Sequence, residues 1–172
     1  GTGKTTLLLQ RAKYLKSQGK EVLYISLDDL YFTENTLLSL ADEFQRMGGT
    51  HLFVDEVHKY PQWARELKNL YDSFSNLIVT FSGSSILEIF KQEVDLSRRA
   101  LRYELPGLSF REYLAFTNII TFQPITFEDL INNHRQIASE ITSKVKPLPH
   151  FRTYLQSGYY PFFMEKERDY AL

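Results

Sequence analysis

The chain has 172 residues, 43% of them hydrophobic, which is enough to bury the core of one domain or of one domain and part of another. Its 20 basic and 21 acidic residues give a net charge of −1, which argues against nucleic-acid binding over the whole surface but not against a local basic patch. It has no cysteine, which excludes disulfides and cysteine-based zinc sites and fits a cytoplasmic protein. No apolar run approaches the roughly 20 residues of a membrane-spanning helix, so we expect no membrane partner.

Helical and strand patterns alternate over residues 1–106. In chain order, the pattern predicts a helix over 4–18, a strand over 21–27, a helix marked by Leu37, Ala41 and Phe44, a strand over 51–54, a helix from Pro61, a strand over 77–81, a helix capped by Ser85 and a last strand over 102–105. Strands without polar alternation, separated by helices, indicate a parallel sheet covered on both faces. The expected fold is therefore three-layer α/β.

The pattern changes after Pro106. Ser109 and Glu112 form a capping box, and Thr126 caps a longer helix that Pro147 interrupts. We expect residues 1–106 to form the α/β core and residues 107–172 to form a small, mostly helical appendage that leads towards a further C-terminal domain.

The first six residues match the second half of a phosphate-binding P-loop, G-x-x-x-x-G-K-[ST]. The motif predicts that backbone amides at the start of the first helix hold a triphosphate, that Lys4 reaches its β- and γ-phosphates and that the Thr5 hydroxyl completes a Mg²⁺ shell. The candidate nucleotide-binding residues are Gly1, Thr2, Gly3, Lys4, Thr5 and Thr6.

The first glycine of this motif, and the strand that leads into such a loop, would lie upstream of residue 1. We therefore expect the sequence to be a piece of a longer protein, with a P-loop NTPase sheet that lacks its first strand. The alternative for Gly3, Lys4 and Thr5 is an ordinary helix start.

An apolar strand ends in two adjacent acids, Asp55 and Glu56. An aspartate at this place can hold Mg²⁺, commonly through water, and the glutamate after it can act as the general base on the attacking water. The alternative is a solvated strand end. The order of loop, helix, strand, helix and acidic strand end favours the nucleotide site, with ATP and Mg²⁺ as cofactors.

Two serines follow the next strand, at the edge of the sheet where ligands of parallel sheets bind. Ser82 or Ser84 could contact the γ-phosphate or the attacking water, and the sequence does not separate them. The alternative is that Ser85 caps a helix and its neighbours only shape the turn.

Arg98 and Arg99 form a basic stretch with Arg102. An arginine delivered to the γ-phosphate, often from a neighbouring subunit, can raise the rate by ~10³–10⁵. Arg98 and Arg99 are the candidates for this role, and delivery from a neighbouring subunit would make the protein a homo-oligomer. The alternatives are a solvated strand start and a basic patch for nucleic acid.

Three other polar residues lie close to the motifs. Asp28 and Asp29 end a predicted strand and could face the site, but we interpret them as an ordinary acid pair at a strand end. His58 could contact substrate, but we assign it to the loop before Pro61.

These motifs resemble the prokaryotic AAA-type P-loop ATPases of the archaeal-ATPase-like group. The resemblance rests on residues 1–8, 55–63, 67–72, 82–85, 105–113 and 154–161. It implies that Lys4 and Thr5 bind the phosphates and Mg²⁺, that Asp55 binds Mg²⁺ and that Glu56 activates water. The family often has Gly-Arg where this chain has Ser97-Arg98, and its further C-terminal domain lies outside this sequence.

Three functions remain open at this stage. The first is an ATPase module whose nucleotide state moves an attached domain. The second is a low-turnover, nucleotide-dependent binding switch, with DNA as a candidate partner that the net charge does not support. The third is a small-molecule kinase, which Glu56 argues against because a kinase excludes water instead of activating it. No motif selects ATP over GTP.

Overall fold

The computed structural model describes residues 2–83, 96 and 98–162. It divides into two compact units, one of residues 4–104 and one of residues 105–172 together with residues 1–3.

The unit of residues 4–104 is an α/β structure built on a parallel sheet of three described strands in the order β1-β2-β3. Its elements are α1 (Lys4–Ser17), β1 (Val22–Ser26), the 3-10 helix η1 (Leu30–Thr33), α2 (Leu37–Arg46), β2 (His51–Asp55), the 3-10 helix η2 (Val57–Lys59), α3 (Trp63–Ser73) and β3 (Ile78–Phe81). The register pairs Ser26 with Asp55 and Val54 with Phe81, so the carboxyl ends of the three strands meet at one edge.

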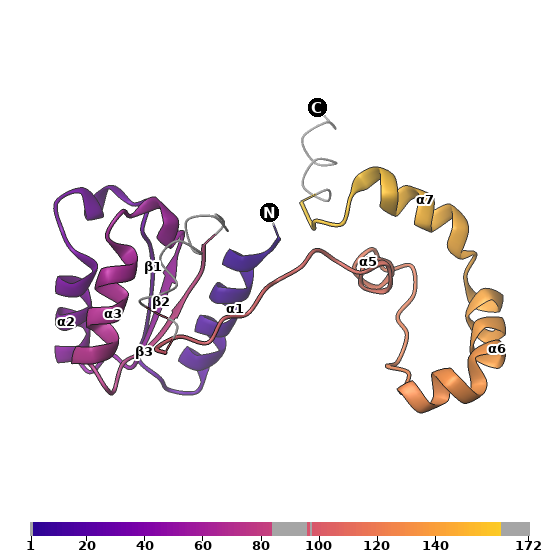
Figure 1. Ribbon diagram of the computed structural model, residues 1–172, viewed down its shortest axis with the longest axis horizontal. Helices are drawn as coiled ribbons and strands as arrows, with labels where there is room; N and C mark the ends of the chain where they lie inside the picture. Colours follow the sequence, from indigo (N-terminus) through magenta and orange to yellow (C-terminus); the bar gives the residue numbers. More distant parts are fainter. Residues whose placement is uncertain (1, 84–95, 97, 163–172) are drawn as a thin grey trace. The chain divides into compact units, whose positions relative to one another are not determined.

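Helices cover both faces of this sheet (Figure 1). On one face, Leu8 and Ala12 of α1 pack against Phe53 of β2. On the other face, α2 and α3 pack against Leu52 and Val54, the neighbours of Phe53 along β2. Successive strand residues point to opposite faces, so a continuous apolar run supplies both layers. The predicted three-layer α/β fold with a parallel sheet is confirmed.

The predicted strand over residues 102–105 is wrong, because these residues form no regular structure. Leu101 and Tyr103 are almost fully exposed, and Arg102 pairs with Glu104 two residues along the chain. An apolar alternating pattern becomes a strand only where a sheet edge and a buried face receive it. The helix predicted after Ser85 lies outside the described residues.

The second unit contains the helices α5 (Phe110–Phe116), α6 (Phe127–Lys144) and α7 (Pro147–Ser157). The Ser109–Glu112 capping box and the Thr126 cap are both present, as predicted. An aromatic cluster joins α5 to α7, and its members are Phe110, Tyr113, Phe151 and Tyr154. The Tyr154 hydroxyl also donates to the Leu108 carbonyl at 2.7 Å.

Among the described residues, none of the helices combines the length and the apolar character that crossing a membrane requires.

Candidate nucleotide-binding site

Asp55 is the last residue of β2 and lies at the carboxyl edge of the sheet, where parallel sheets bind their ligands. It is 1% exposed, and Phe53 beneath it is packed against α1. A carboxylate buried to this degree needs several donors, because burial without hydrogen bonds disfavours the charged form.

Four groups donate hydrogen bonds to Asp55. Its Oδ2 accepts from the Thr5 hydroxyl at 2.6 Å and from the Tyr24 hydroxyl at 2.9 Å. Its Oδ1 accepts from the Ser82 hydroxyl and from the Glu56 amide, the latter at 3.0 Å. The donors come from α1, β1 and the residues after β2 and β3, so this one carboxylate joins four segments of the chain.

These contacts set the charge of Asp55. Burial alone would raise the pKa of its carboxyl, but the hydrogen bonds from Ser82, Thr5, Tyr24 and the Glu56 amide outweigh burial and lower the pKa below its usual value. Burial and the hydrogen bond to Asp55 raise the pKa of Tyr24 to about 12. At neutral pH, Asp55 is therefore an anion and Tyr24 a neutral donor.

The Thr5 hydroxyl and the Asp55 carboxylate provide two hard oxygen atoms 2.6 Å apart. Mg²⁺ prefers such ligands and is typically held by one or two protein oxygens, water and substrate phosphates. The two predicted metal ligands are thus adjacent, and their chemistry fits Mg²⁺.

Lys4 and Thr5 form the first turn of α1, and the amino end of a helix carries a partial positive charge. Gly3 precedes them with a φ of 89°, a conformation that side chains rarely tolerate and that glycine adopts readily. Thr6 is exposed in the same turn, and Gly1 lies outside the described residues.

Glu56 follows Asp55 in the left-handed region, with φ 53° and ψ 38°. A residue other than glycine pays about 1–2 kcal/mol for this conformation, so the surrounding contacts must hold it. The Val57 amide donates to the Ser82 carbonyl at 3.0 Å, and the Lys59 amide donates to the Glu56 carbonyl at 2.9 Å. The Glu56 amide donates to Oδ1 of Asp55, so hydrogen bonds fix this sharp turn on both sides of Glu56.

The Glu56 carboxylate is one third exposed, and its Oε2 lies 3.4 Å from Nδ1 of His58. His58 belongs to η2, in the segment before Pro61 as predicted. Glu56 therefore combines a partly exposed carboxylate with a place directly after Asp55 in the chain.

The structure brings Ser82 to the site but not the arginines of the same subunit. Ser84 lies outside the described residues. Arg99 makes a two-pronged contact with Asp72 near the end of α3, with N–O distances of 2.9 and 3.2 Å. α3 runs back from the carboxyl edge to the start of β3, so Asp72 lies towards the opposite edge of the sheet from Asp55. Arg98, beside Arg99, is exposed.

The sequence analysis missed Tyr24 as a partner of Asp55. Tyr24 packs with Phe53 on the face that α1 covers, and the period-two alternation of a strand places Asp55 on that same face. The alternation of each strand could have placed both side chains on one face. Pairing Tyr24 with Asp55 also required the register between β1 and β2, which the sequence does not give. The contact of His58 with Glu56 was also missed, because it depends on the local turn.

Comparison with known proteins places these motifs in a family context. The family model described as "AAA domain" matches residues 1–114. Two proteins of Methanocaldococcus jannaschii are similar to the chain, and both are described as uncharacterized. The first, MJ1637, is 32% identical over 179 residues, which cover 97% of this chain and 37% of that protein.

The second, MJ1544, is 31% identical over 107 residues, which cover 61% of this chain and 22% of that protein. The chain thus spans well under half the length of both relatives. No solved structure matches the chain significantly.

Proposed function

The chain belongs to the AAA domain family, a family of nucleotide-binding ATPase modules, and on this premise we propose that it binds and hydrolyses ATP in a Mg²⁺-dependent reaction. The observation that carries the proposal is the pairing of Thr5 with Asp55, because it joins the start of α1 to the acidic end of β2. The amides of residues 1–6 and the Lys4 ammonium would bind the phosphates, as they do in P-loops.

Thr5 and Asp55 would hold the Mg²⁺. The chemistry that Mg²⁺ would supply there is positive charge, which stabilises the negative charge that develops during phosphoryl transfer. The residues around Asp55 would keep its carboxylate charged and oriented towards the ion. Asp55 is kept ionised by its four donors, and Ser82 orients Oδ1 while Thr5 and Tyr24 orient Oδ2.

Glu56 would act as the general base. It would accept a proton from the water that attacks the γ-phosphate, and its fixed left-handed backbone would keep the carboxylate beside the site. A glutamate in this place favours hydrolysis over transfer to an acceptor hydroxyl, because a kinase must keep water out.

The coupling of hydrolysis to an attached domain is part of the same proposal. It is supported by the length of the relatives, since the matched region is 37% of one and 22% of the other. We further propose that the protein works in the cytoplasm, in keeping with the absence of cysteine from these 172 residues.

The test separates binding from hydrolysis in the full-length protein. Glu56→Gln keeps the size of the side chain and removes the base. We expect ATP affinity within about threefold of the unchanged protein and phosphate release lowered by at least ~10²-fold, the contribution typical of a general base. Equilibrium binding of a fluorescent ATP analogue and steady-state phosphate release measure the two.

Glu43→Gln is the matched control, because Glu43 is an exposed glutamate on α2. Unchanged hydrolysis in Glu56→Gln would remove Glu56 from the mechanism. A protein that binds ATP tightly but releases no phosphate in its unchanged form would instead be a nucleotide-dependent switch.

A further inference from the structure

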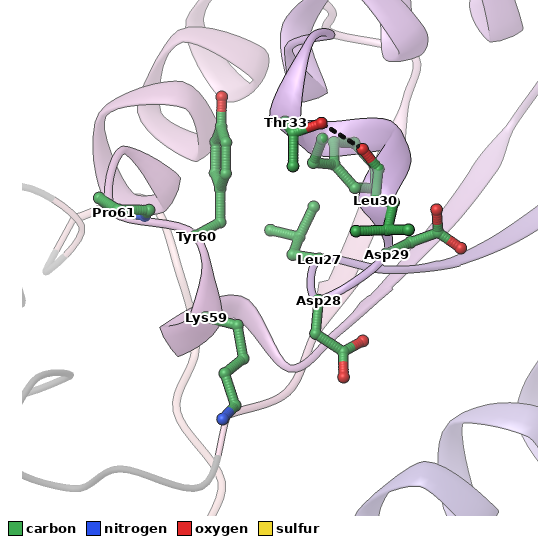
Figure 2. Close-up of a pocket in the computed structure, with 9 residues that line it drawn as sticks. Leu27, Asp28, Asp29, Leu30, Thr33, Lys59, Tyr60 and Pro61 are labelled. Atoms are coloured by element: carbon green, nitrogen blue, oxygen red, sulfur yellow. Dashed lines mark hydrogen bonds between the residues drawn. The ribbon is translucent and has the colours of Figure 1, made fainter.

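A cavity of about 400 Å³ opens beside the nucleotide site, at the carboxyl edge of the sheet. It lies between the loop that leaves β1 and the loop that leaves β2, and Figure 2 shows its lining side chains. The lining residues are Leu27, Asp28, Asp29, Leu30, Phe32, Thr33, Lys59, Tyr60 and Pro61. Its volume is in the range of sites that take a small ligand or one or two large side chains.

The base and one wall of the cavity are apolar and firmly anchored. Leu27 and Phe32 are buried in the core, and the Tyr60 ring lies 6.1 Å from the Phe32 ring. The Tyr60 hydroxyl donates to Oε1 of Glu66 at 2.8 Å, and the other oxygen of this buried carboxylate accepts from the Leu38 amide at 3.0 Å. The wall is therefore preformed, so a ligand need not order it on binding.

The rim of the cavity carries charge. Asp28 and Asp29 are exposed on one side, and Lys59 is exposed on the other. Asp28 accepts a hydrogen bond from the Ser26 hydroxyl, and Asp29 accepts one from the Tyr31 amide, so both carboxylates are held in place. Two carboxylates against one ammonium give the rim a net negative charge, which repels phosphate groups and attracts a cation.

Both sides of the cavity are hydrogen-bonded to the acids of the nucleotide site. The Leu27 amide donates to the Asp55 carbonyl at 3.0 Å. The Lys59 amide donates to the Glu56 carbonyl at 2.9 Å, through the single turn of η2. A ligand that shifts either side therefore shifts the backbone of Asp55 or Glu56.

We propose that this cavity docks a short segment of a protein partner that presents an apolar side chain beside a lysine or arginine. The apolar side chain would lie on Leu27 and the Tyr60 ring, and the cation would lie between Asp28 and Asp29. Docking would change the rate of ATP hydrolysis through η2 and the start of the β1–η1 loop. This last step rests on the proposed function, whereas the docking itself does not.

The binding test uses the full-length protein and defined probes. The probes are fluorescein-labelled hexapeptides with a central Leu-Arg or Phe-Arg pair, matched peptides with Leu-Glu or Gly-Arg, and a labelled 20-nucleotide single strand of DNA. Fluorescence anisotropy without nucleotide measures binding. We expect the apolar-basic peptides to bind at least about tenfold more tightly than the matched peptides and the DNA.

The variant Asp28→Asn/Asp29→Asn removes both charges and keeps the oxygen atoms that accept from Ser26 and Tyr31. We expect the affinity of this double variant for the apolar-basic peptides to be about tenfold lower, because charge-assisted hydrogen bonds are roughly twice as strong as neutral ones. Glu43→Gln is the matched control on α2 and should leave binding unchanged. Phosphate release, measured with saturating Leu-Arg peptide, should change at least twofold in the unchanged protein and not in the double variant.

Equal binding of the Leu-Arg and Leu-Glu peptides would overturn the proposal, and so would undiminished binding by the double variant or tighter binding of the DNA at this site. Binding as expected with unchanged phosphate release would overturn the coupling to Glu56. Because binding is measured without nucleotide, failure of the ATPase proposal would leave the docking result intact.

Discussion

A single carboxylate organises the site at the scale of residues. Asp55 accepts from Thr5, Tyr24, Ser82 and the Glu56 amide, and these bonds keep it ionised in a buried place. The motif spacing predicted that Thr5 and Asp55 lie together, because a P-loop and an acidic strand end meet at the carboxyl edge of a parallel sheet. It could not predict Tyr24, whose role depends on strand register and on the reach of one hydroxyl.

Tyr24→Phe tests the positioning role of this hydroxyl. The ring still packs on Phe53, but Oδ2 of Asp55 loses one of its two donors. Changes to groups that orient metal ligands typically cost 10–100-fold in metal affinity or activity. We expect the Mg²⁺ concentration for half-maximal phosphate release to rise about tenfold, with the rate at saturating Mg²⁺ changing by less than threefold.

A Mg²⁺ titration of ATP turnover in the full-length protein measures both values. Tyr14→Phe is the control, since Tyr14 is exposed on α1. A Mg²⁺ midpoint that stays the same in Tyr24→Phe would show that Tyr24 only packs.

At the scale of elements, the helix layers constrain the place that a strand leading into α1 would take. The crossovers through α2 and α3 pass over one face and progress from β1 to β3, whereas α1 covers the opposite face (Figure 1). Crossovers between parallel strands are right-handed in nearly all proteins. Because α1 covers the face opposite to α2 and α3, a right-handed crossover through α1 into β1 must start from a strand on the β2 side of β1. On the β2 side of β1, the places next to β1 and between β2 and β3 are filled, which leaves the outer edge of β3.

Hydrogen exchange at the outer edge of β3 tests this placement. The Ile78 and Ser82 amides donate towards β2, so the alternating amides of Val79 and Phe81 face outwards. In the full-length protein we expect Val79 and Phe81 to exchange at least ~100-fold more slowly than unstructured amides, because a neighbouring strand would accept from them. Exchange measured by NMR or mass spectrometry, with Ile78 as the internal reference, tests this.

Rapid exchange of Val79 and Phe81 in the full-length protein would contradict the placement of a strand beside β3.

Element prediction from sequence succeeded where packing and pattern agree. The strands at β1, β2 and β3 were found because each is a short apolar run between helices, and the caps at Ser109 and Thr126 because their spacing has one local meaning. The strand prediction over residues 102–105 was wrong because a strand also needs the edge of a sheet to pair with, and the local sequence pattern does not show whether such an edge is available.

At the scale of the whole molecule, the arginines bear on assembly. Arg99 is paired with Asp72, and Asp72 lies towards the amino edge of the sheet, away from Asp55 of the same subunit. Arg98 beside it is exposed. An arginine that serves the γ-phosphate from this place would therefore have to reach a neighbouring copy. The sequence could raise this role but not place the residue, because an arginine finger has no spacing rule within its own subunit.

A mixing experiment tests this role. Lys4→Ala removes phosphate binding but keeps Arg98, and Arg98→Ala removes the arginine but keeps the nucleotide site. If Arg98 acts on a neighbour, mixtures of the two inactive full-length variants should release phosphate at least fivefold faster than either alone, because a mixed assembly contains intact pairs.

Arg65→Ala is the control, because Arg65 is an exposed arginine on α3. Additive rates in the mixtures, or full activity of Arg98→Ala alone, would exclude Arg98 from the site.

The most direct test of the account is phosphate release from ATP by the full-length protein, measured with Mg²⁺ present and with the metal chelated. Because Thr5 and Asp55 are proposed to hold Mg²⁺ against the triphosphate, we expect turnover with Mg²⁺ and a fall to background both on chelation and in Lys4→Ala. Equal turnover without the metal, or full turnover by Lys4→Ala, would contradict it.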